Sequence, residues 1–189
     1  MRKTKLISTL LAILTLFMVS CSGGEKKQEV KEIVPQGKGQ SGVEAVEGET
    51  PNALQVAKSL DDFKTLVVAI EAAGVEDAVV NVGPLTIFAP VNAAFDKLPE
   101  GLVATLLEPE NKGKLAFILT NHVAPANYPI KQLKKEARKG RKLYMASGKY
   151  LVVENKEDGI YVGGTKILKT VKVSNGWIHV IDNVLVPAE

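Results

Sequence analysis

The sequence predicts a single α+β domain, because helical periodicity dominates the first half of its folded part and strand periodicity the last third. From residue 53 to residue 123, apolar residues recur at the spacing of amphipathic helices. After Pro129 the pattern moves to a period of two, with turn residues between the runs. One apolar run bounded by prolines, residues 83–90, predicts a strand among the helices. Helices followed by strands indicate the α+β class.

The helical part begins near Ala53. The second helix carries Phe63, Leu66, Val67 and Ile70 on one stripe. We expect Asp61 or Asp62 to cap this helix and Gly74 to end it, and we expect Asn92 to cap the helix that follows the strand. The expected helices cover residues 53–60, 61–74, 75–80, 93–99, 101–110 and 111–123.

The expected strands after residue 129 cover residues 149–155, 159–164 and 165–187. In the last of these, Asn175-Gly176 predicts a hairpin with a type I′ turn, whose two central residues need positive φ. Val171 and Val173 then share the core face with Ile178 and Val180. Trp177, His179 and Ile181 share the opposite face, which we expect a helix or another strand to cover.

The first twenty residues are typical of an export signal. Arg2, Lys3 and Lys5 precede an apolar run, residues 6–20, that is shorter than the roughly 20 residues of a membrane span. The run ends at Cys21, the only cysteine, and resembles a bacterial lipoprotein signal, although Met18 stands where leucine is usual. We expect cleavage before Cys21 and acylation of its thiol. An ordinary secretory signal with an incidental cysteine remains the alternative.

Residues 21–52 are predicted to be the lipidated cysteine and a flexible tether, and residues 53–189 the folded domain. The tether is rich in Gly, Glu, Lys and Gln and lacks aromatic residues, so it cannot bury enough apolar surface to fold. Without the signal, 21 basic and 21 acidic residues remain. This neutral balance does not indicate nucleic-acid binding.

Motifs for catalysis, metal binding or cofactor binding were not found. The sequence has no G-x-S-x-G elbow, no phosphate-binding loop and only two histidines, far apart. We therefore expect no enzyme activity, catalytic residue, metal site or cofactor. His179 and Asp182 are interpreted as scaffold residues, with Asp182 accepting backbone N–H groups near the strand end. Thr86 and Asn92 are interpreted as a strand hydroxyl and a helix cap.

Three segments resemble the fasciclin-like, or FAS1, domain family. Residues 85–99 and 175–187 are similar to its two signatures, and residues 118–125 to its central segment, where Asn121 replaces a common tyrosine and His122 is retained. The resemblance implies a β-wedge of two sheets with helices around it, and adhesion or extracellular binding instead of catalysis. The motif residues expected to build this scaffold are Thr86, Phe88, Ala89, Pro90, Asn92, Phe95, His122, Asn175, Gly176, His179 and Asp182.

A basic run stands out against the neutral mean. Its seven cations are Lys131, Lys134, Lys135, Arg138, Lys139, Arg141 and Lys142, and its one acid is Glu136. On a helix the first four cations share a face, and Gly140 ends the helix, leaving the last two on a loop. The run is interpreted either as a solvated face or as a contact for an anionic polysaccharide or lipid headgroup.

Together these observations predict a monomeric, lipid-anchored bacterial envelope protein that works in adhesion or extracellular binding. Its partners would be the membrane, through Cys21, and a protein or anionic polysaccharide. Because no Asp follows Cys21, we expect the outer membrane in a Gram-negative cell. The alternatives are a periplasmic carrier of a small apolar ligand, which needs an internal cavity, and a hydrolase using His179 or His122.

Overall fold

The computed structural model describes residues 49–187. The expected signal, Cys21 and the expected tether up to residue 48 therefore lie outside the described residues. Within the described part, the structure contains no helix that is long and apolar enough to cross a membrane. Among the described residues the first element is α1, which begins at Ala53.

The helices before residue 123 confirm the prediction from periodicity. They are α1 (Ala53–Ser59), α2 (Lys64–Ala73), α3 (Glu76–Val80), α4 (Asn92–Phe95), α5 (Leu102–Leu107) and α6 (Lys112–Thr120), with 3-10 turns η2 (Asp61–Phe63) and η3 (Pro109–Asn111). Gly74 ends α2 with a φ of 65°, as expected. A later helix, α7 (Ile130–Arg138), carries most of the basic run.

Within the described residues, seven strands form one mixed sheet in the order β2-β1-β7-β6-β5-β4-β3. The strands are β1 (Leu85–Pro90), β2 (Val123–Ala124), β3 (Lys142–Tyr144), β4 (Tyr150–Lys156), β5 (Gly159–Val162), β6 (Thr165–Val173) and β7 (Gly176–Ile181). β1 and β7 pair in parallel and the other neighbours are antiparallel. The N–H of Ala146, just after β3, donates to the carbonyl of Val123 in β2 at 2.7 Å, so the two ends of the sheet nearly meet.

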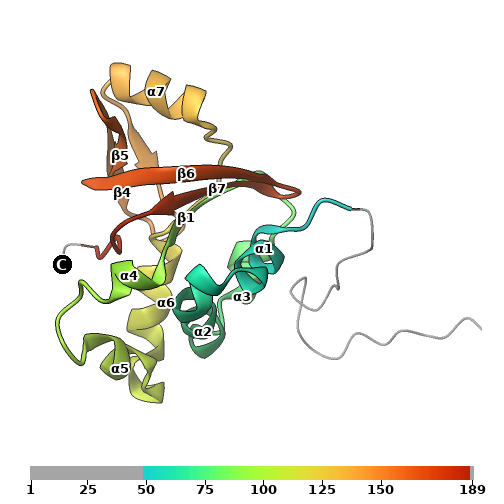
Figure 1. The fold of residues 1–189 in the computed structure, drawn as a ribbon, viewed down its shortest axis with the longest axis vertical. Coiled ribbons are helices and arrows are strands. Elements are labelled where there is room, and N and C mark those ends of the chain that lie inside the picture. The colour runs from blue at the N-terminus through green and yellow to red at the C-terminus, as the bar shows by residue number, and fades with distance from the viewer. Residues whose placement is uncertain (1–48, 188–189) are drawn as a thin grey trace, which may run out of the picture. The chain divides into compact units, whose positions relative to one another are not determined.

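The sheet is a wedge in two parts, and β6 belongs to both. Thr165 and Lys166 pair with β5, whereas the rest of β6 pairs with β7. The helices α1 to α6 cover one side of β1 and β7, and α7 lies on the other side with β4 and β5 (Figure 1). This arrangement confirms the predicted α+β class and the wedge of two sheets.

Two apolar cores lie on opposite sides of β1 and β7. The first, which we call the helix-side core, contains Ile87 and Ile178 with residues of α1 to α6. The second, the α7-side core, contains Phe88 and Ile181 with Leu133 of α7. Successive strand residues point to opposite faces, so neighbouring positions along each central strand enter different cores.

The last hairpin has a different turn from the one expected. Val173 pairs with Gly176, so Ser174 and Asn175 are the loop residues and Asn175-Gly176 is not the central pair. Val171 consequently faces Ile178 in the ladder. This change moves the pairing by two residues, which leaves every side chain on its predicted face. Ile178 and Val180 lie in the helix-side core as expected.

Gly176 allows β1 and β7 to approach each other closely. Its φ is 144°, and a Cβ at this position would lie 1.8 Å from the backbone oxygen of Leu85 in β1. Leu85 is also the residue that pairs with Gly176 in the parallel ladder. The residue must therefore be glycine because β1 passes where a side chain would stand.

The predicted helix caps near α2 and α4 are wrong. Asn92 makes no capping bond to its own helix. Its Oδ1 instead accepts the N–H of Thr65 in the first turn of α2 at 3.0 Å, and its Nδ2 donates to the carbonyl of Asp61 at 2.8 Å. The Asp61 carboxylate stays at the surface, paired with Lys64. The first turn of α2 is thus capped from a distant part of the chain.

Candidate functional site: buried braces and a basic surface

His179 is fully buried in β7 and has a partner for each ring nitrogen. Nε2 lies 2.7 Å from the carbonyl oxygen of Tyr128, and Nδ1 lies 2.9 Å from the hydroxyl of Thr170. The ring stacks on Phe88, with centroids 5.5 Å apart. Burial lowers the pKa of His179 below its usual value, which favours the neutral imidazole. This histidine therefore braces β1, β6, β7 and the segment before α7.

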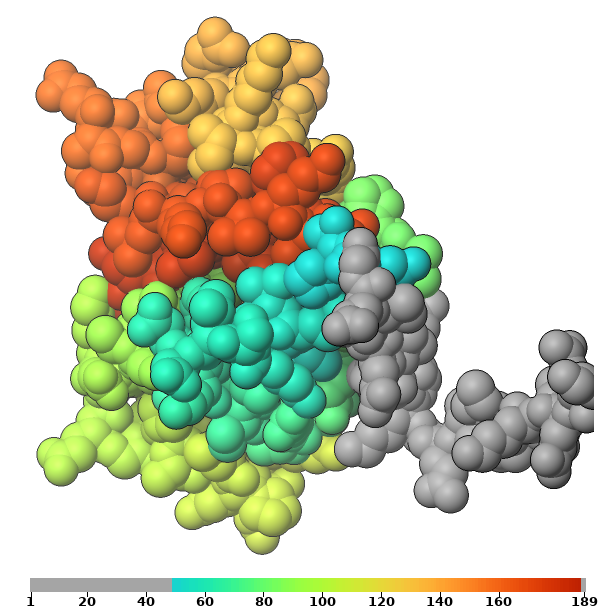
Figure 2. All heavy atoms as spheres, turned by 45° about the vertical axis from the view of Figure 1, so that its right-hand side comes forward, coloured from blue at the N-terminus to red at the C-terminus, as the bar shows by residue number. Residues whose placement is uncertain are grey.

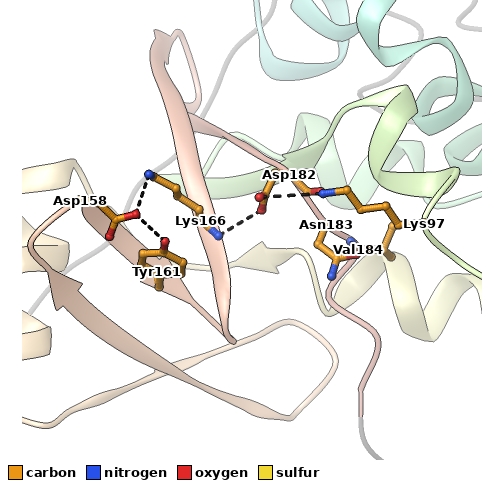
Figure 3. A network of polar contacts seen from close by, with 7 residues as sticks. All are labelled: Lys97, Asp158, Tyr161, Lys166, Asp182, Asn183 and Val184. Carbon is orange, nitrogen blue, oxygen red and sulfur yellow. Dashed lines mark hydrogen bonds and ion pairs between the residues drawn. The ribbon is translucent and has the colours of Figure 1, made fainter.

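Asp182 belongs to a different polar network at the end of β7 (Figure 3). Its Oδ1 accepts the backbone N–H of Lys166 at 3.2 Å, and its carbonyl accepts from Nζ of Lys97 at 2.6 Å. The Lys166 ammonium extends to Asp158, 2.8 Å away, which also accepts from Tyr161. These bonds link β7, β6 and the β4–β5 turn. His179 and Asp182 have separate partners, so they do not form a catalytic pair.

His122 and its neighbour Asn121 hold both backbone groups of Leu185. The Leu185 N–H donates to Nε2 of His122 at 2.9 Å, and the Leu185 carbonyl accepts from Nδ2 of Asn121 at 2.9 Å. Nδ1 of His122 lies 2.8 Å from the carbonyl of Ile118, so the ring proton is on Nδ1. Burial lowers the pKa of His122 to about 4. We call this arrangement the Leu185 clamp.

Other motif residues are also engaged inside the fold. Asn175 accepts the N–H of Ala53 at 3.1 Å and donates to the carbonyl of Val79 at 2.9 Å, which fixes α1 and α3 to the β6–β7 hairpin. Thr86 donates to the carbonyl of Ala126 and accepts the N–H of Tyr128. The apolar motif residues divide between the cores, with Ala89 and Phe95 on the helix side, Phe88 on the α7 side, and Pro90 at the end of β1.

Two cavities lined by described residues of the helix-side core are small. Their volumes are about 30 Å³ and 20 Å³, and His122 lies at the wall of both. Small-molecule sites typically occupy roughly 300–1,000 Å³, so neither cavity can hold the ligand of a carrier. Among the described residues, no group of three or more His, Cys, Asp or Glu side chains is placed to hold a metal ion.

The basic run forms a real surface on α7. Leu133 is fully buried against the α7-side core, which turns the opposite face of the helix to solvent. The single acid, Glu136, is buried, accepts from Gln132 and lies 3.7 Å from Arg141. Arg141 is thereby paired. The remaining cations, which we call the basic surface, are exposed and form no ion pair within the described residues: Lys131, Lys134, Lys135, Arg138, Lys139 and Lys142.

Figure 2 shows α7, in yellow-orange, on the side of β6 and β7 (red-orange) that faces away from the blue-green N-terminal helices. Lys142, expected on a loop, is instead the first residue of β3. Of the basic surface, Lys142 therefore lies on the edge strand of the sheet, and the other five cations lie on α7 and at its C-terminal end.

An aromatic pair that was not predicted from the sequence lies beside this edge. Tyr144 in β3 and Tyr150 in β4 face each other in the ladder, with ring centroids 5.3 Å apart and exposed fractions of 48% and 63%. Lys142 and its partner Val152 lie two residues further along the strands, so they share this outer face. Leu143, between the two exposed residues of β3, is fully buried. This alternation in Lys142–Tyr144 was the available signal, but three residues are too few to predict a strand.

The mixed sheet, the helices over one side of it and the buried motif residues define a FAS1 domain. Residues 61–187 match the family model described as Fasciclin domain, and the chain belongs to that family. Its fold is similar to the FAS1 domain pair of the insect cell adhesion molecule Fasciclin I, with a TM-score of 0.64 and 21% identity over 74% of this chain and 52% of that chain.

Particular relatives include two proteins of Synechocystis sp. (strain ATCC 27184 / PCC 6803 / Kazusa). The protein sll1483 is 41% identical over 71% of this chain and 72% of its own length, and sll1735 is 36% identical over 71% of this chain and 97% of its own length. The transforming growth factor-beta-induced protein ig-h3 of Sus scrofa is 33% identical over 73% of this chain and 20% of its own length. Fasciclin domains occur in cell adhesion proteins and in extracellular or secreted proteins.

Proposed function

We propose that this protein is a non-enzymatic, envelope-anchored adhesion module that binds an anionic polysaccharide through the basic surface of α7. The family and its adhesion relatives support the class of function. The buried, internally bonded histidines are consistent with it, since neither faces a cavity large enough for a substrate. The lipid anchor at Cys21 and the outer-membrane location are part of the same proposal and rest on the sequence of residues 1–21.

The basic surface is the observation that carries this proposal. Lys131, Lys134, Lys135 and Arg138 are three or four residues apart on one helix, so their like charges repel one another. Of the seven cations in the basic run, only Arg141 has an acidic partner among the described residues, and that partner is Glu136. A polymer with regularly spaced carboxylates or sulfates would relieve this repulsion at several positions simultaneously.

The aromatic pair favours a polysaccharide over a lipid headgroup. Tyr144 and Tyr150 present apolar ring faces with polar hydroxyl tips, which suits pyranose rings with apolar faces and hydroxyl edges. Lys142 belongs both to the basic surface and to the outer face that carries these rings. Lys142 and the rings lie on the face of the sheet that points away from the α7-side core, so a uronate-bearing chain would contact them and the cations of α7 together by passing around the β3 edge.

The test is retention of residues 49–189 on immobilised polygalacturonate, with dextran as the neutral control. The Debye length falls from about 10 Å at 0.1 M salt to about 3 Å at 1 M, so retention should be lost across this range. It should also be lost on changing Lys134, Lys135, Arg138 and Lys139 to Gln. A matched variant that removes the same charge elsewhere, with Lys64, Lys112, Lys169 and Lys172 changed to Gln, should keep it.

Two measurements distinguish an anionic polysaccharide from an anionic membrane surface as the partner. The double variant Tyr144→Ala/Tyr150→Ala should bind polygalacturonate several-fold more weakly. The vesicle measurement is separate, and if the partner were a membrane surface the wild-type domain would sediment with vesicles containing phosphatidylglycerol. Retention that survives the four α7 substitutions would contradict the proposal.

A further inference from the structure

A surface groove with a volume of about 470 Å³ lies among α5, α6 and the segment that follows β7. Its apolar lining comes from all three: Leu102 and Leu106 of α5, Phe117 and Ile118 of α6, and Val186 and Pro187 of the C-terminal segment. We call this feature the tail groove. Its volume falls within the range of about 300–1,000 Å³ that is typical of small-molecule sites.

The tail groove exposes apolar side chains to water. Phe117 is 40% exposed and Val186 is 50% exposed. Leaving such groups in water costs free energy that a bound apolar group would recover. Within the described part of the chain, no other segment covers them.

Two lysines, Lys114 of α6 and Lys149 of the β3–β4 turn, also line the groove. Neither forms an ion pair within the described residues, and no acidic residue is among the lining residues. Nζ of Lys149 lies 6.0 Å from the centroid of the Phe117 ring, so positive charge and apolar surface are directly adjacent. The groove is complementary to a molecule with an apolar body and an anionic end.

The wall formed by the C-terminal segment is held in place by the Leu185 clamp. Leu185 precedes Val186, and both of its backbone polar groups are bonded to buried side chains of the Asn121-His122 pair. Ser147 donates to the same Asn121 from the β3–β4 turn, at 2.9 Å, which fixes the turn that carries Lys149. The apolar wall and the backbone of the turn that carries Lys149 are therefore held in position by contacts within the domain.

We infer that the tail groove binds a single-chain fatty carboxylate, with the alkyl chain along Leu102, Leu106 and Phe117 and the carboxylate between Lys114 and Lys149. A peptide is a poorer occupant, because its backbone N–H groups need acceptors and no lining side chain is an acceptor. This site is separate from the basic surface of α7, so it does not depend on the function proposed above.

Equilibrium dialysis of residues 49–189 against decanoate and decan-1-ol tests the carboxylate. Both ligands have the same chain, so the alcohol measures the apolar part alone. We expect decanoate to bind about fivefold more tightly, the upper value for an exposed ion pair. In the series octanoate, decanoate and dodecanoate, each added methylene that enters the groove should tighten binding by up to about fourfold.

Two variants locate the site. Lys114→Gln/Lys149→Gln should bind decanoate and decan-1-ol equally, while Lys131→Gln/Lys134→Gln on α7 should keep the wild-type preference. Phe117→Ser should weaken the binding of both decanoate and decan-1-ol, and an unchanged Tm will show that this variant folds. Equal binding of acid and alcohol by the wild-type domain, or undiminished decanoate binding by folded Phe117→Ser, would overturn the inference. Neither result bears on polygalacturonate retention.

Discussion

The backbone N–H of Leu185 donates a hydrogen bond to Nε2 of His122 across a distance of 2.9 Å. This bond exists only while Nε2 is unprotonated, and burial lowers the pKa of His122 from 6.5 to about 4. The imidazole therefore ties the end of the domain to α6 only as a neutral ring.

Stability should fall as the pH falls from about 6.5 to about 4. In this window the unfolded chain binds a proton at His122 and the folded domain does not, so protonation favours unfolding. Below about pH 4 both states are protonated, and the contribution of His122 to the free energy of unfolding has been lost completely. The gap between the two pKa values corresponds to about 3 kcal/mol. Burial also lowers the pKa of His179, so this residue likewise makes the domain less stable as the pH falls. Urea unfolding of the wild type and of His122→Gln at several pH values measures the difference, because the other titrating groups are common to both. Equal pH dependence in the two proteins would contradict this prediction.

Gly176→Ala should destabilise the domain by about 3 kcal/mol or more. A Cβ at this position would meet the Leu85 carbonyl, which is backbone and cannot move without disturbing the β1–β7 ladder. The control is Gly113→Ala in α6, where a Cβ meets nothing within 4 Å. That substitution should leave stability unchanged or raise it by up to about 1 kcal/mol. Denaturant midpoints compare the two, and a Gly176→Ala protein as stable as the wild type would show that the observed β1–β7 register is wrong.

Asn92→Ala should lower the free energy of unfolding by about 1–2 kcal/mol, because it removes the cap of α2. Asp61→Ala tests the assignment made from sequence. Its carboxylate is exposed and pairs only with Lys64, so its loss should cost less than about 0.5 kcal/mol. Thermal unfolding of the two variants shows which substitution lowers stability more. If Asp61→Ala were the more damaging change, the long-range cap would not be the one that matters.

Cys21→Ser should abolish membrane anchoring of the protein expressed in a bacterial host. The apolar segment ending at Cys21 is the basis of this prediction. Mass spectrometry of the N-terminal peptide should find acyl groups on Cys21 of the wild type. A mature wild-type protein that starts elsewhere, or that carries no acyl mass, would leave the folded domain secreted and free.

The parts of the fold that were predicted correctly are those determined by nearby residues. The stripe of Phe63, Leu66 and Ile70 predicted the helical segment that the structure forms as η2 and α2, and Gly74 ends α2, because both signals act within a few turns of helix. The alternation in β7 assigned Ile178 and Val180 to the correct face. The cations of α7 were correctly expected at the surface, since so many charges cannot enter a core.

The errors arise where distant segments decide the outcome. The turn of the last hairpin depends on β1, which approaches Gly176 from far along the chain. Asn92 has the residue type of a local cap, but tertiary packing directs its amide to α2. Likewise, the sequence could not show that Asn121 and His122 meet Leu185, or that Glu136 would be buried beside Arg141. β2 and β3 are too short to produce a recognisable period.

The parallel pairing of β1 with β7 also has a consequence for the time at which the domain can fold. β1 is made early in the chain and β7 late, so the ladder from Leu85–Gly176 to Pro90–Ile181 has a high contact order. Such non-local pairing slows folding, because a long loop must close before its contacts form. A nascent chain that ends before residue 176 has no partner for one side of β1. The ribosome must therefore finish nearly all of the domain before its central ladder can assemble.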